Sequence, residues 1–148
     1  MMIKWVLIGV FSFFVAVGAG LYFLKGAPKG DAAEVDWQLL NQMDYLSQKA
    51  PDALQKHHQQ RVKIPGFMVP LEDNSRLVVE FLLVPNPQAC IHVPPPPPNQ
   101  MVYIKMKKGT PAAFGPIWVY GEFKIAQTRS KFGEASFEMD ADFVEPYR

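Results

Sequence analysis

The sequence predicts a mainly β domain behind an N-terminal transmembrane helix and a short amphipathic helix. Three observations support this fold class. They are an uncharged apolar run from Trp5 to Leu24, a helical spacing of apolar residues from Trp37, and alternating apolar and polar residues from Arg61 onward. We therefore expect three parts: a membrane anchor (1–25), a linker and helical segment (26–60), and a β-barrel domain (61–148).

The first segment is long enough to cross a bilayer. At about 1.5 Å per residue, a helix over residues 5–24 spans the ~30 Å of a hydrocarbon core. A cleaved signal peptide is the alternative, because Val17-Gly18-Ala19 resembles a cleavage site, but the apolar run continues to Leu24 and exceeds a signal core. We expect a single-pass protein of the bacterial inner membrane with its C-terminal domain in the periplasm.

The charge balance argues against nucleic acid as a partner. Lys4, Lys25 and Lys29 belong to the N-terminal segment, which leaves 12 of the 15 basic residues against 14 acidic ones in the rest of the chain. A slightly acidic domain lacks the basic surface that nucleic acids or anionic lipids need for strong attraction. The linker over 26–31, rich in Gly and Pro, separates the two parts.

A short amphipathic helix is expected after this linker. Trp37, Leu40, Met43 and Leu46 follow one another at helical spacing and would form a single apolar stripe. Pro51 marks a break, and residues 52–60 are expected to form a polar helix or loop.

The remainder predicts five antiparallel strands. Pro65-Gly66 inside the first strand indicates a bulge or a sharp coil, and the second strand is apolar on both faces, which is typical of a central strand. Five strands with a bent first strand fit a small OB-like or rolled antiparallel barrel. The predicted strands are 61–71, 76–84, 101–107, 117–126 and 135–144.

The only cysteine, Cys90, stands two residues before His92. In extended backbone the two side chains lie on one face, and a thiolate with an imidazole suits zinc or copper. Glu80 is a third candidate ligand, and His57-His58 could add others. The alternatives are a buried, inert Cys90 and a backbone-bonded His92. A thiol nucleophile lacks a third orienting group, so we do not expect an enzyme.

Glu80 interrupts the apolar second strand and needs a partner, because burying an unpaired carboxylate costs several kcal/mol. A metal or His92 would serve a functional site. Arg61, Lys63 or Lys105 on a neighbouring strand would serve equally as a structural partner.

Five consecutive prolines follow His92. They favour polyproline II, about 16 Å long without a backbone donor, which can dock into an aromatic groove of a partner protein. The same segment could instead form a rigid strap over its own domain, packed on Trp118, Tyr120 or Tyr103. The candidate partner-binding residues are Pro94, Pro95, Pro96, Pro97, Pro98, Asn99 and Gln100.

A row of carboxylates is predicted along the last strand. Glu138, Asp140 and Asp142 alternate with apolar residues, so they line one face. A bound cation is one interpretation. A solvated face, paired across the sheet with Lys105 and Lys107, is the interpretation we favour.

Several stretches together resemble the DUF3299 family of bacterial envelope proteins. They are VKIPGFMVPLE (62–72), EFLLVPNPQACIHVPPPPPNQMVYI (80–104), PIWVYGEF (116–123) and VEPY (144–147), of which ACIHVPPPPPNQ is the most specific. The resemblance covers the β domain. It marks Glu80, Cys90, His92, the prolines, Asn99 and Gln100 as motif positions without giving them roles.

The resemblance implies an exported protein of Gram-negative bacteria. Some members resemble accessory components encoded beside ABC-type export systems linked with zinc response, although this chain lacks the lipobox cysteine of lipoprotein members. The sequence therefore predicts a membrane-anchored periplasmic accessory module that binds zinc or copper through Cys90, His92 and Glu80 for an envelope transport system. The alternative is a non-catalytic protein-interaction module that uses the pentaproline segment.

Overall fold

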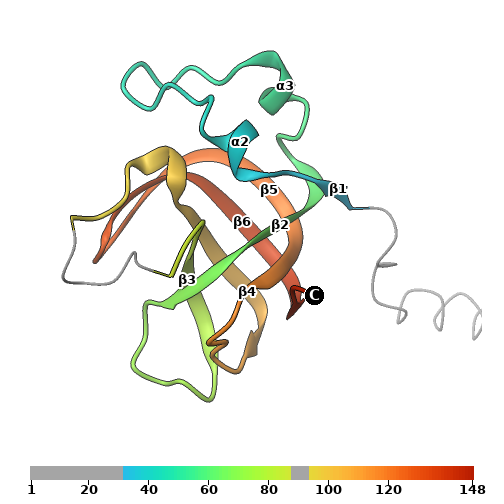
Figure 1. Ribbon diagram of the computed structural model, residues 1–148, viewed down its shortest axis with the longest axis vertical. Helices are drawn as coiled ribbons and strands as arrows, with labels where there is room; N and C mark the ends of the chain where they lie inside the picture. Colours follow the sequence, from blue (N-terminus) through green and yellow to red (C-terminus); the bar gives the residue numbers. More distant parts are fainter. Residues whose placement is uncertain (1–31, 88–93) are drawn as a thin grey trace, which may run out of the picture. The chain divides into compact units, whose positions relative to one another are not determined.

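Strands make up most of the computed structural model, which describes residues 32–87 and 94–148 (Figure 1). Its helical parts are single turns: α2 (Trp37–Leu40), α3 (Asp52–Gln55) and the 3₁₀ helix η2 (Pro98–Gln100). The prediction of a mainly β domain is confirmed. The strands are β1 (Ala33–Glu34), β2 (Gln60–Pro70), β3 (Val78–Val84), β4 (Val102–Thr110), β5 (Ile117–Ser130) and β6 (Gly133–Pro146).

The described residues form a six-stranded sheet in the order β1-β2-β3-β4-β6-β5. β2 pairs with β5 as well as with β3. Each of the five longer strands is therefore hydrogen-bonded to two others, and the last in the order, β5, pairs with the first of them, β2. These five strands are the ones that the alternating pattern predicts. The two-residue strand β1 is too short to leave such a pattern.

The prediction of a purely antiparallel arrangement is wrong for two pairings. β4 runs parallel to β6, with Ile104 opposite Met139, and β1 runs parallel to β2. β5 and β6 form a long hairpin whose second strand lies against β4. Because two chain reversals separate β4 from β6, the two strands point the same way.

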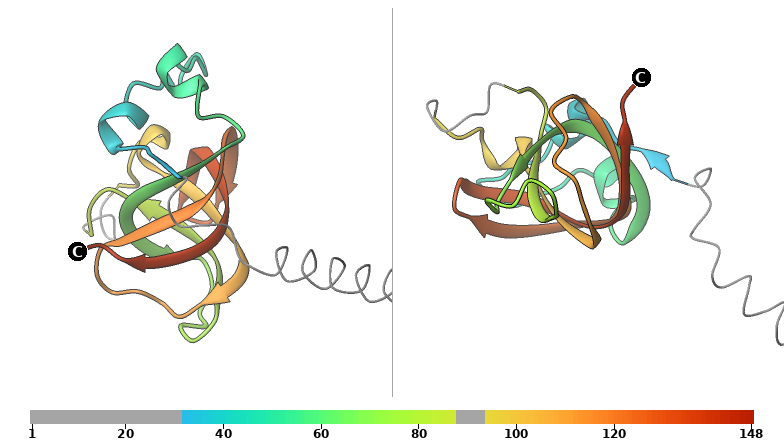
Figure 2. Two further views of the ribbon diagram at one scale, coloured as in Figure 1. Left: turned by 90° about the vertical axis from the view of Figure 1, so that its right-hand side faces the viewer. Right: turned by 90° about the horizontal axis from the view of Figure 1, so that it is seen from below.

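β2 changes partner at Pro65-Gly66. Up to Gly66 it pairs with β5, and from Phe67 it pairs with β3, without a register shift in either ladder. Figure 2 shows the strand curving strongly along its length. A Cβ on Gly66 would stand 2.7 Å from the carbonyl oxygen of Val84, so the close approach of β3 requires glycine there. The predicted sharp coil is therefore present, but a classical bulge is not.

The main core fills the inner face of these strands. Alternate residues of β2, β3, β4 and β6 point inward, as the period of two requires. Its largest members with almost no exposure are Phe81, Phe123, Phe137, Ile64, Leu83, Ile104 and Met139.

The helical segment packs against the same core but is less helical than predicted. Leu40 and Met43 are buried, and the indole Nε1 of Trp37 donates a hydrogen bond to the carbonyl of Pro65 at 2.6 Å. However, α2 ends at Leu40, and Leu46 is 85% exposed. The Asp44 carboxylate accepts hydrogen bonds from the amides of Leu46 and Ser47, which makes a turn where the stripe predicted helix.

The expected membrane anchor lies outside the described residues, which begin at Ala32. Within residues 32–87 and 94–148, no helix is both long and apolar enough to span a membrane.

Candidate functional site

The motif residues divide between described and undescribed parts of the chain. Cys90 and His92 fall in residues 88–93, outside the described residues. Glu80 lies on β3, and Pro94–Gln100 precedes β4. The geometry of the candidate site therefore comes from the outer face of β3 and β4 and from the proline run.

Glu80 is half-buried on β3, opposite Lys105 of β4. Its carboxylate hydrogen-bonds with the phenol of Tyr103, a side chain on the same face of the neighbouring strand. Burial of Tyr103 and this bond to Glu80 raise the pKa of the Tyr103 hydroxyl to about 12. The phenol therefore stays protonated and donates to the carboxylate across the physiological range.

The basic residues that we expected beside Glu80 bind other carboxylates. Arg61 pairs with Asp142, Lys63 with Glu34 at 3.2 Å, and Lys105 with Glu138 at 3.2 Å. The prediction of Arg61, Lys63 or Lys105 as the partner of Glu80 is therefore wrong, because a neutral phenol can satisfy a half-buried carboxylate as well. A metal ion or His92 as a further partner stays a prediction. Tyr103 stands two residues before Lys105, so strand alternation places it on the same face of the sheet as Lys105 and Glu80.

A second apolar cluster surrounds Tyr103 on this outer face. Its buried members are Leu82, Val84, Met101, Tyr103 and Ala135, with Phe67, Val69, Leu71 and Phe132 partly buried beside them. We call this set the outer cluster. It explains why β3 is apolar on both faces, as the sequence predicted for a central strand.

The carboxylate row of β6 is paired across the sheet. Lys105 binds Glu138, Lys107 binds Asp142 at 2.6 Å, and Lys124 binds Asp140. The two pairings predicted from β4 are confirmed. Among the described residues, no group of three or more His, Cys, Asp or Glu side chains is arranged to hold a metal ion.

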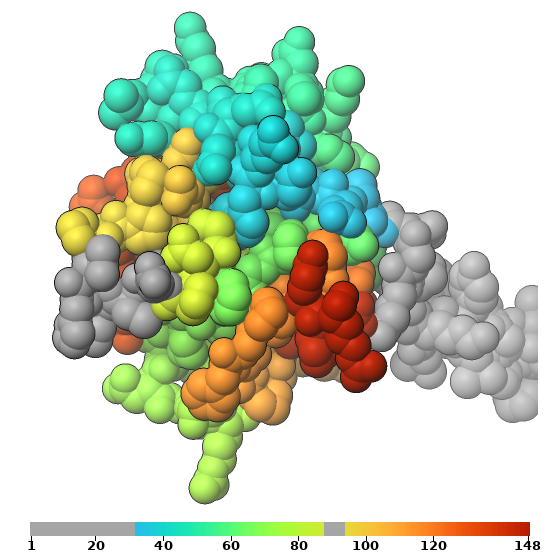
Figure 3. Space-filling model, viewed as in Figure 1, coloured from blue at the N-terminus to red at the C-terminus, as the bar shows by residue number. Residues whose placement is uncertain are grey.

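The proline run is held at its C-terminal end by Asn99. This buried side chain donates from Nδ2 to the carbonyls of Asn41 and Met43, each at 3.2 Å. η2 begins at Pro98, the last residue of the run, and Pro95 lies beside Gly133 at the β5–β6 turn. Figure 3 shows this segment, in yellow, on the surface next to the cyan residues of the helical segment. The run thus borders the first residues of β6, beyond the part of β6 that β4 covers.

Exposure alternates along the run. Pro94, Pro95 and Pro97 are exposed, whereas Pro96 and Pro98 are half-buried. Pro97 has φ −61° and ψ 153°, the polyproline II conformation. The run contacts the β5–β6 turn and the loop after α2. The expected packing on Trp118, Tyr120 or Tyr103 stays a prediction.

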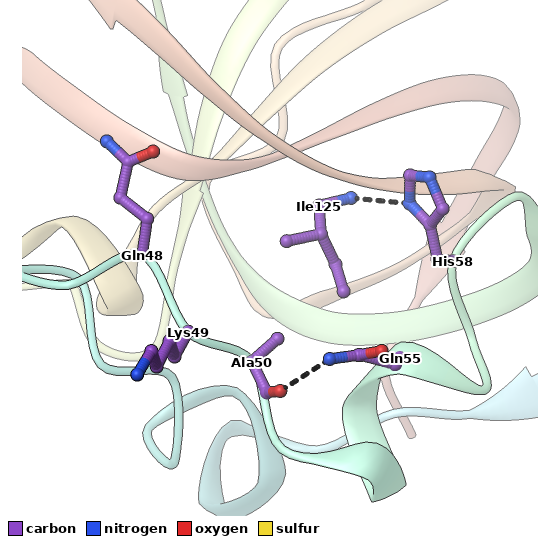
Figure 4. Close-up of a pocket in the computed structure, with 6 residues that line it drawn as sticks. All are labelled: Gln48, Lys49, Ala50, Gln55, His58 and Ile125. Atoms are coloured by element: carbon purple, nitrogen blue, oxygen red, sulfur yellow. Dashed lines mark hydrogen bonds between the residues drawn. The ribbon is translucent and has the colours of Figure 1, made fainter.

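A hollow of about 470 Å³ lies between the helical segment and β5 (Figure 4). Its polar groups bind one another. His58 Nδ1 accepts the amide of Ile125 at 3.1 Å, Gln55 donates to the carbonyl of Ala50 at 2.8 Å, and Gln48 donates to Gln127 at 2.5 Å. The bonds of His58 and Gln48 fasten the helical segment to β5, and the bond of Gln55 lies within the helical segment. His58 contributes here by its ring nitrogen to a strand amide, a role that its position in a polar segment did not predict.

Together these features define a small β-rich domain with an exposed polyproline segment fixed to one end of its longest hairpin. The chain belongs to the DUF3299 family, described as a protein of unknown function, whose model matches residues 29–146. The resemblance drawn from the motifs is therefore confirmed. The match extends beyond the β domain and includes the segment with α2 and α3.

A solved structure of the same family is similar to this chain. It is a DUF3299 family protein from Pseudomonas aeruginosa PAO1, with 36% sequence identity and a TM-score of 0.66; the alignment covers 80% of this chain and 98% of that one. No curated protein matches this chain.

Proposed function

We propose that this domain is a non-catalytic binding module that offers its proline run to a partner protein. The observation that carries the proposal is the exposure of Pro94 and Pro97. Polyproline II repeats every three residues, so these two rings lie along one edge of the helix, and that edge faces solvent. Aromatic-lined grooves recognise this spacing in proline-rich ligands.

The ends of the run favour binding because they fix its shape in advance. Asn99 ties the C-terminal end to the loop after α2, and Pro95 lies against the β5–β6 turn. A segment that is already ordered loses little conformational entropy when a partner docks. The half-buried Pro96 and Pro98 then serve as the inner side of the strap, and the partner contacts the outer edge.

We place this module in the bacterial envelope. Residues 1–25 would be a single-pass anchor in the inner membrane, and residues 61–148 would lie in the periplasm. The uncharged run of residues 5–24 supports the anchor. An accessory role toward an ABC-type envelope system is the partner class that the family resemblance suggests.

We further propose that the five longer strands form an OB-like barrel. The pairing order β2-β3-β4-β6-β5, with β2 returning to β5, supports this, because each of these strands then has a partner on both sides.

Site-specific photocross-linking tests the proline contact. Benzoylphenylalanine in place of Pro95, which is exposed beside the edge of Pro94 and Pro97, should give one discrete protein adduct in the full chain expressed in its native membranes. A synthetic peptide of five prolines in excess should compete that adduct away. Pro94→Ala should reduce the adduct several-fold, since it removes one ring of that edge.

Pro111→Ala is the matched control, because Pro111 is equally exposed but lies in the β4–β5 loop. It should leave the adduct unchanged. An adduct that survives both the peptide and Pro94→Ala, or that falls equally with Pro111→Ala, would remove the proline run as the binding element.

A transition-metal site is the second candidate. Glu80 favours it, since this half-buried carboxylate lies on β3, the strand that precedes Cys90 and His92 in the sequence. Thiolate and imidazole would supply the soft donors for zinc or copper, with Glu80 as ligand or as the partner of one.

Titration calorimetry with Zn²⁺ or Cu⁺ tests this second candidate. Wild type should bind one equivalent, and Cys90→Ala/His92→Ala should lose at least tenfold in affinity. Equal affinity in the two proteins would end the metal hypothesis.

A further inference from the structure

The loop between β4 and β5 carries an exposed phenylalanine. Phe114 is 95% exposed, yet the loop around it is anchored. The amide of Ala112 donates to the carbonyl of Ser75 at 2.8 Å, and the amide of Tyr147 donates to the carbonyl of Pro116 at 2.9 Å. Ala112 and Ala113 pack against the main core. The ring is therefore presented by a fixed loop.

More apolar surface lies at the same end of the domain. Leu77 is 52% exposed and Val79 is 37% exposed, and both side chains flank Gly109 of β4. Figures 1 and 2 show that the β2–β3 and β4–β5 loops project from the end of the domain opposite α2 and α3. Exposed apolar side chains gathered at one end of a soluble domain mark a contact surface.

Two cations stand behind this apolar surface. Arg76 precedes Leu77 and Lys108 precedes Gly109; both are exposed, and neither has an ion-pair partner among the described residues. Lys107 is already paired with Asp142. Of the acidic residues in the β2–β3 loop, Glu72 accepts the amides of Val79 and Glu80, and Asp73 is exposed.

We propose that this end of the domain rests on the headgroup region of an anionic lipid bilayer. The contact surface, named here the loop surface, consists of Arg76, Leu77, Val79, Lys108 and Phe114. It combines one aromatic ring on a projecting loop with exposed cations in the neighbouring turn and at the end of β4. These residue types match a bilayer interface, where rings enter the apolar boundary and cations meet the lipid phosphates. The domain as a whole is slightly acidic, so the attraction comes from Arg76 and Lys108 at this end and not from the overall charge.

A lipid surface fits these residues better than a protein groove does. The two cations lie on separate loops and strands rather than as a fork around one carboxylate, and a layer of headgroups satisfies charges at any spacing. The loop surface also shares no residue with the proline edge of Pro94 and Pro97. Membrane contact and partner binding can therefore occur together.

Benzophenone cross-linking to lipid tests the proposal on the full chain. Benzoylphenylalanine replaces Phe114, and the purified protein is reconstituted into vesicles of phosphatidylethanolamine and phosphatidylglycerol in a ratio of about seven to three. Irradiation should give a protein mass increased by one phospholipid. Arg76→Gln/Lys108→Gln should lower this adduct at least about fivefold, the factor expected for a cation near an anionic surface.

Leu46 provides the matched control position. Its side chain is 85% exposed, but it belongs to the helical segment at the other end of the domain. The probe at position 46 should give less than a fifth of the lipid adduct found at 114. Equal lipid adducts at both positions, or adducts at 114 with protein alone, would overturn the proposal. The proposal would also be overturned if the lipid adduct at position 114 stayed the same in the double variant and in vesicles of phosphatidylcholine alone.

Discussion

Leu82 and Leu83 are neighbours on β3, are both buried, and face opposite sides of the sheet. Leu83 belongs to the main core, enclosed by β2, β4 and β6, whereas Leu82 belongs to the outer cluster. The outer cluster contains Tyr103 and partly buried side chains such as Phe67, and it borders Glu80. The same residue type thus closes a rigid interior on one side and supports the candidate site on the other.

This difference indicates that the apolar residues on the two faces of β3 contribute differently to the domain. The inner face determines whether the domain folds. The outer face borders the candidate site, with Glu80 beside the outer cluster. Substitutions on the two faces can separate these contributions.

The largest expected effect is on the inner face. Leu83→Ala should lower the free energy of unfolding by about 4 kcal/mol, because a cavity among enclosed strands relaxes little. Leu82→Ala should cost about 2 kcal/mol, since Phe67 and Val69 are partly exposed and can move toward the gap. Urea unfolding of both variants measures the difference. Equal losses would show that the outer cluster is as rigid as the core.

The next effect concerns the hydrogen bonds by which Asn99 holds the proline run. Asn99→Ala should cost about 1–3 kcal/mol, because it leaves the carbonyls of Asn41 and Met43 without their donor. Thermal unfolding monitored by circular dichroism measures the loss. Asn74→Ala, at an exposed turn, should cost less than about 1 kcal/mol. A neutral Asn99→Ala would mean that the run is held by other contacts.

Tyr103→Phe tests the polar edge of the outer cluster. It should cost about 1–2 kcal/mol at pH 8, because the phenol no longer donates to Glu80. The folded-state pKa of about 12 lies above the unfolded value of 10.0, so this contribution is complete below pH 10 and is lost as the pH rises to 12.

Unfolding of wild type and Tyr103→Phe between pH 8 and pH 12 measures that loss, and the difference between them should shrink toward zero. Tyr120 has its pKa raised to about 12 as well, chiefly by its hydrogen bond to Glu145, so Tyr120→Phe serves as the comparison. A gap for Tyr103→Phe that stays constant with pH would contradict the bond to Glu80.

The smallest effect is expected for the paired charges. Lys105→Gln should cost about 0.2–1 kcal/mol in low salt and less in 0.5 M salt, because its side chain is 45% exposed and solvent screens the bond to Glu138. Chemical unfolding at the two salt concentrations measures it. A salt-independent loss above 2 kcal/mol would place this pair within the outer cluster's packing.

The strands could be predicted because their signal is local. A period of two in residues 61–144 places the five longer strands within a few residues of their ends. The parallel pairing of β4 with β6 could not be predicted in this way, since it joins segments that alternate identically whichever direction they run. The stripe from Trp37 to Leu46 failed because a single side chain, Asp44, formed a turn that outweighs helical spacing.

The candidate site was predictable in position but not in its contacts. The motif located Glu80 and the proline run, both of which lie on or beside the outer face. Its partners came from elsewhere in the chain. Asn99 binds carbonyls 56 and 58 residues away, and no sequence rule relates an amide in a proline-rich loop to the end of a distant helix.

The parallel pairing of β4 and β6 also affects the order in which the strands can pair during synthesis. β4 is translated well before β6, and until the last strand emerges one whole edge of β4 has no hydrogen-bonding partner. The unpaired N–H and C=O groups of such an edge can pair with another chain and lead to aggregation. A newly made chain therefore depends on the prompt arrival of its final hairpin, and slowing translation within residues 133–146 should expose nascent molecules to chaperones and proteases.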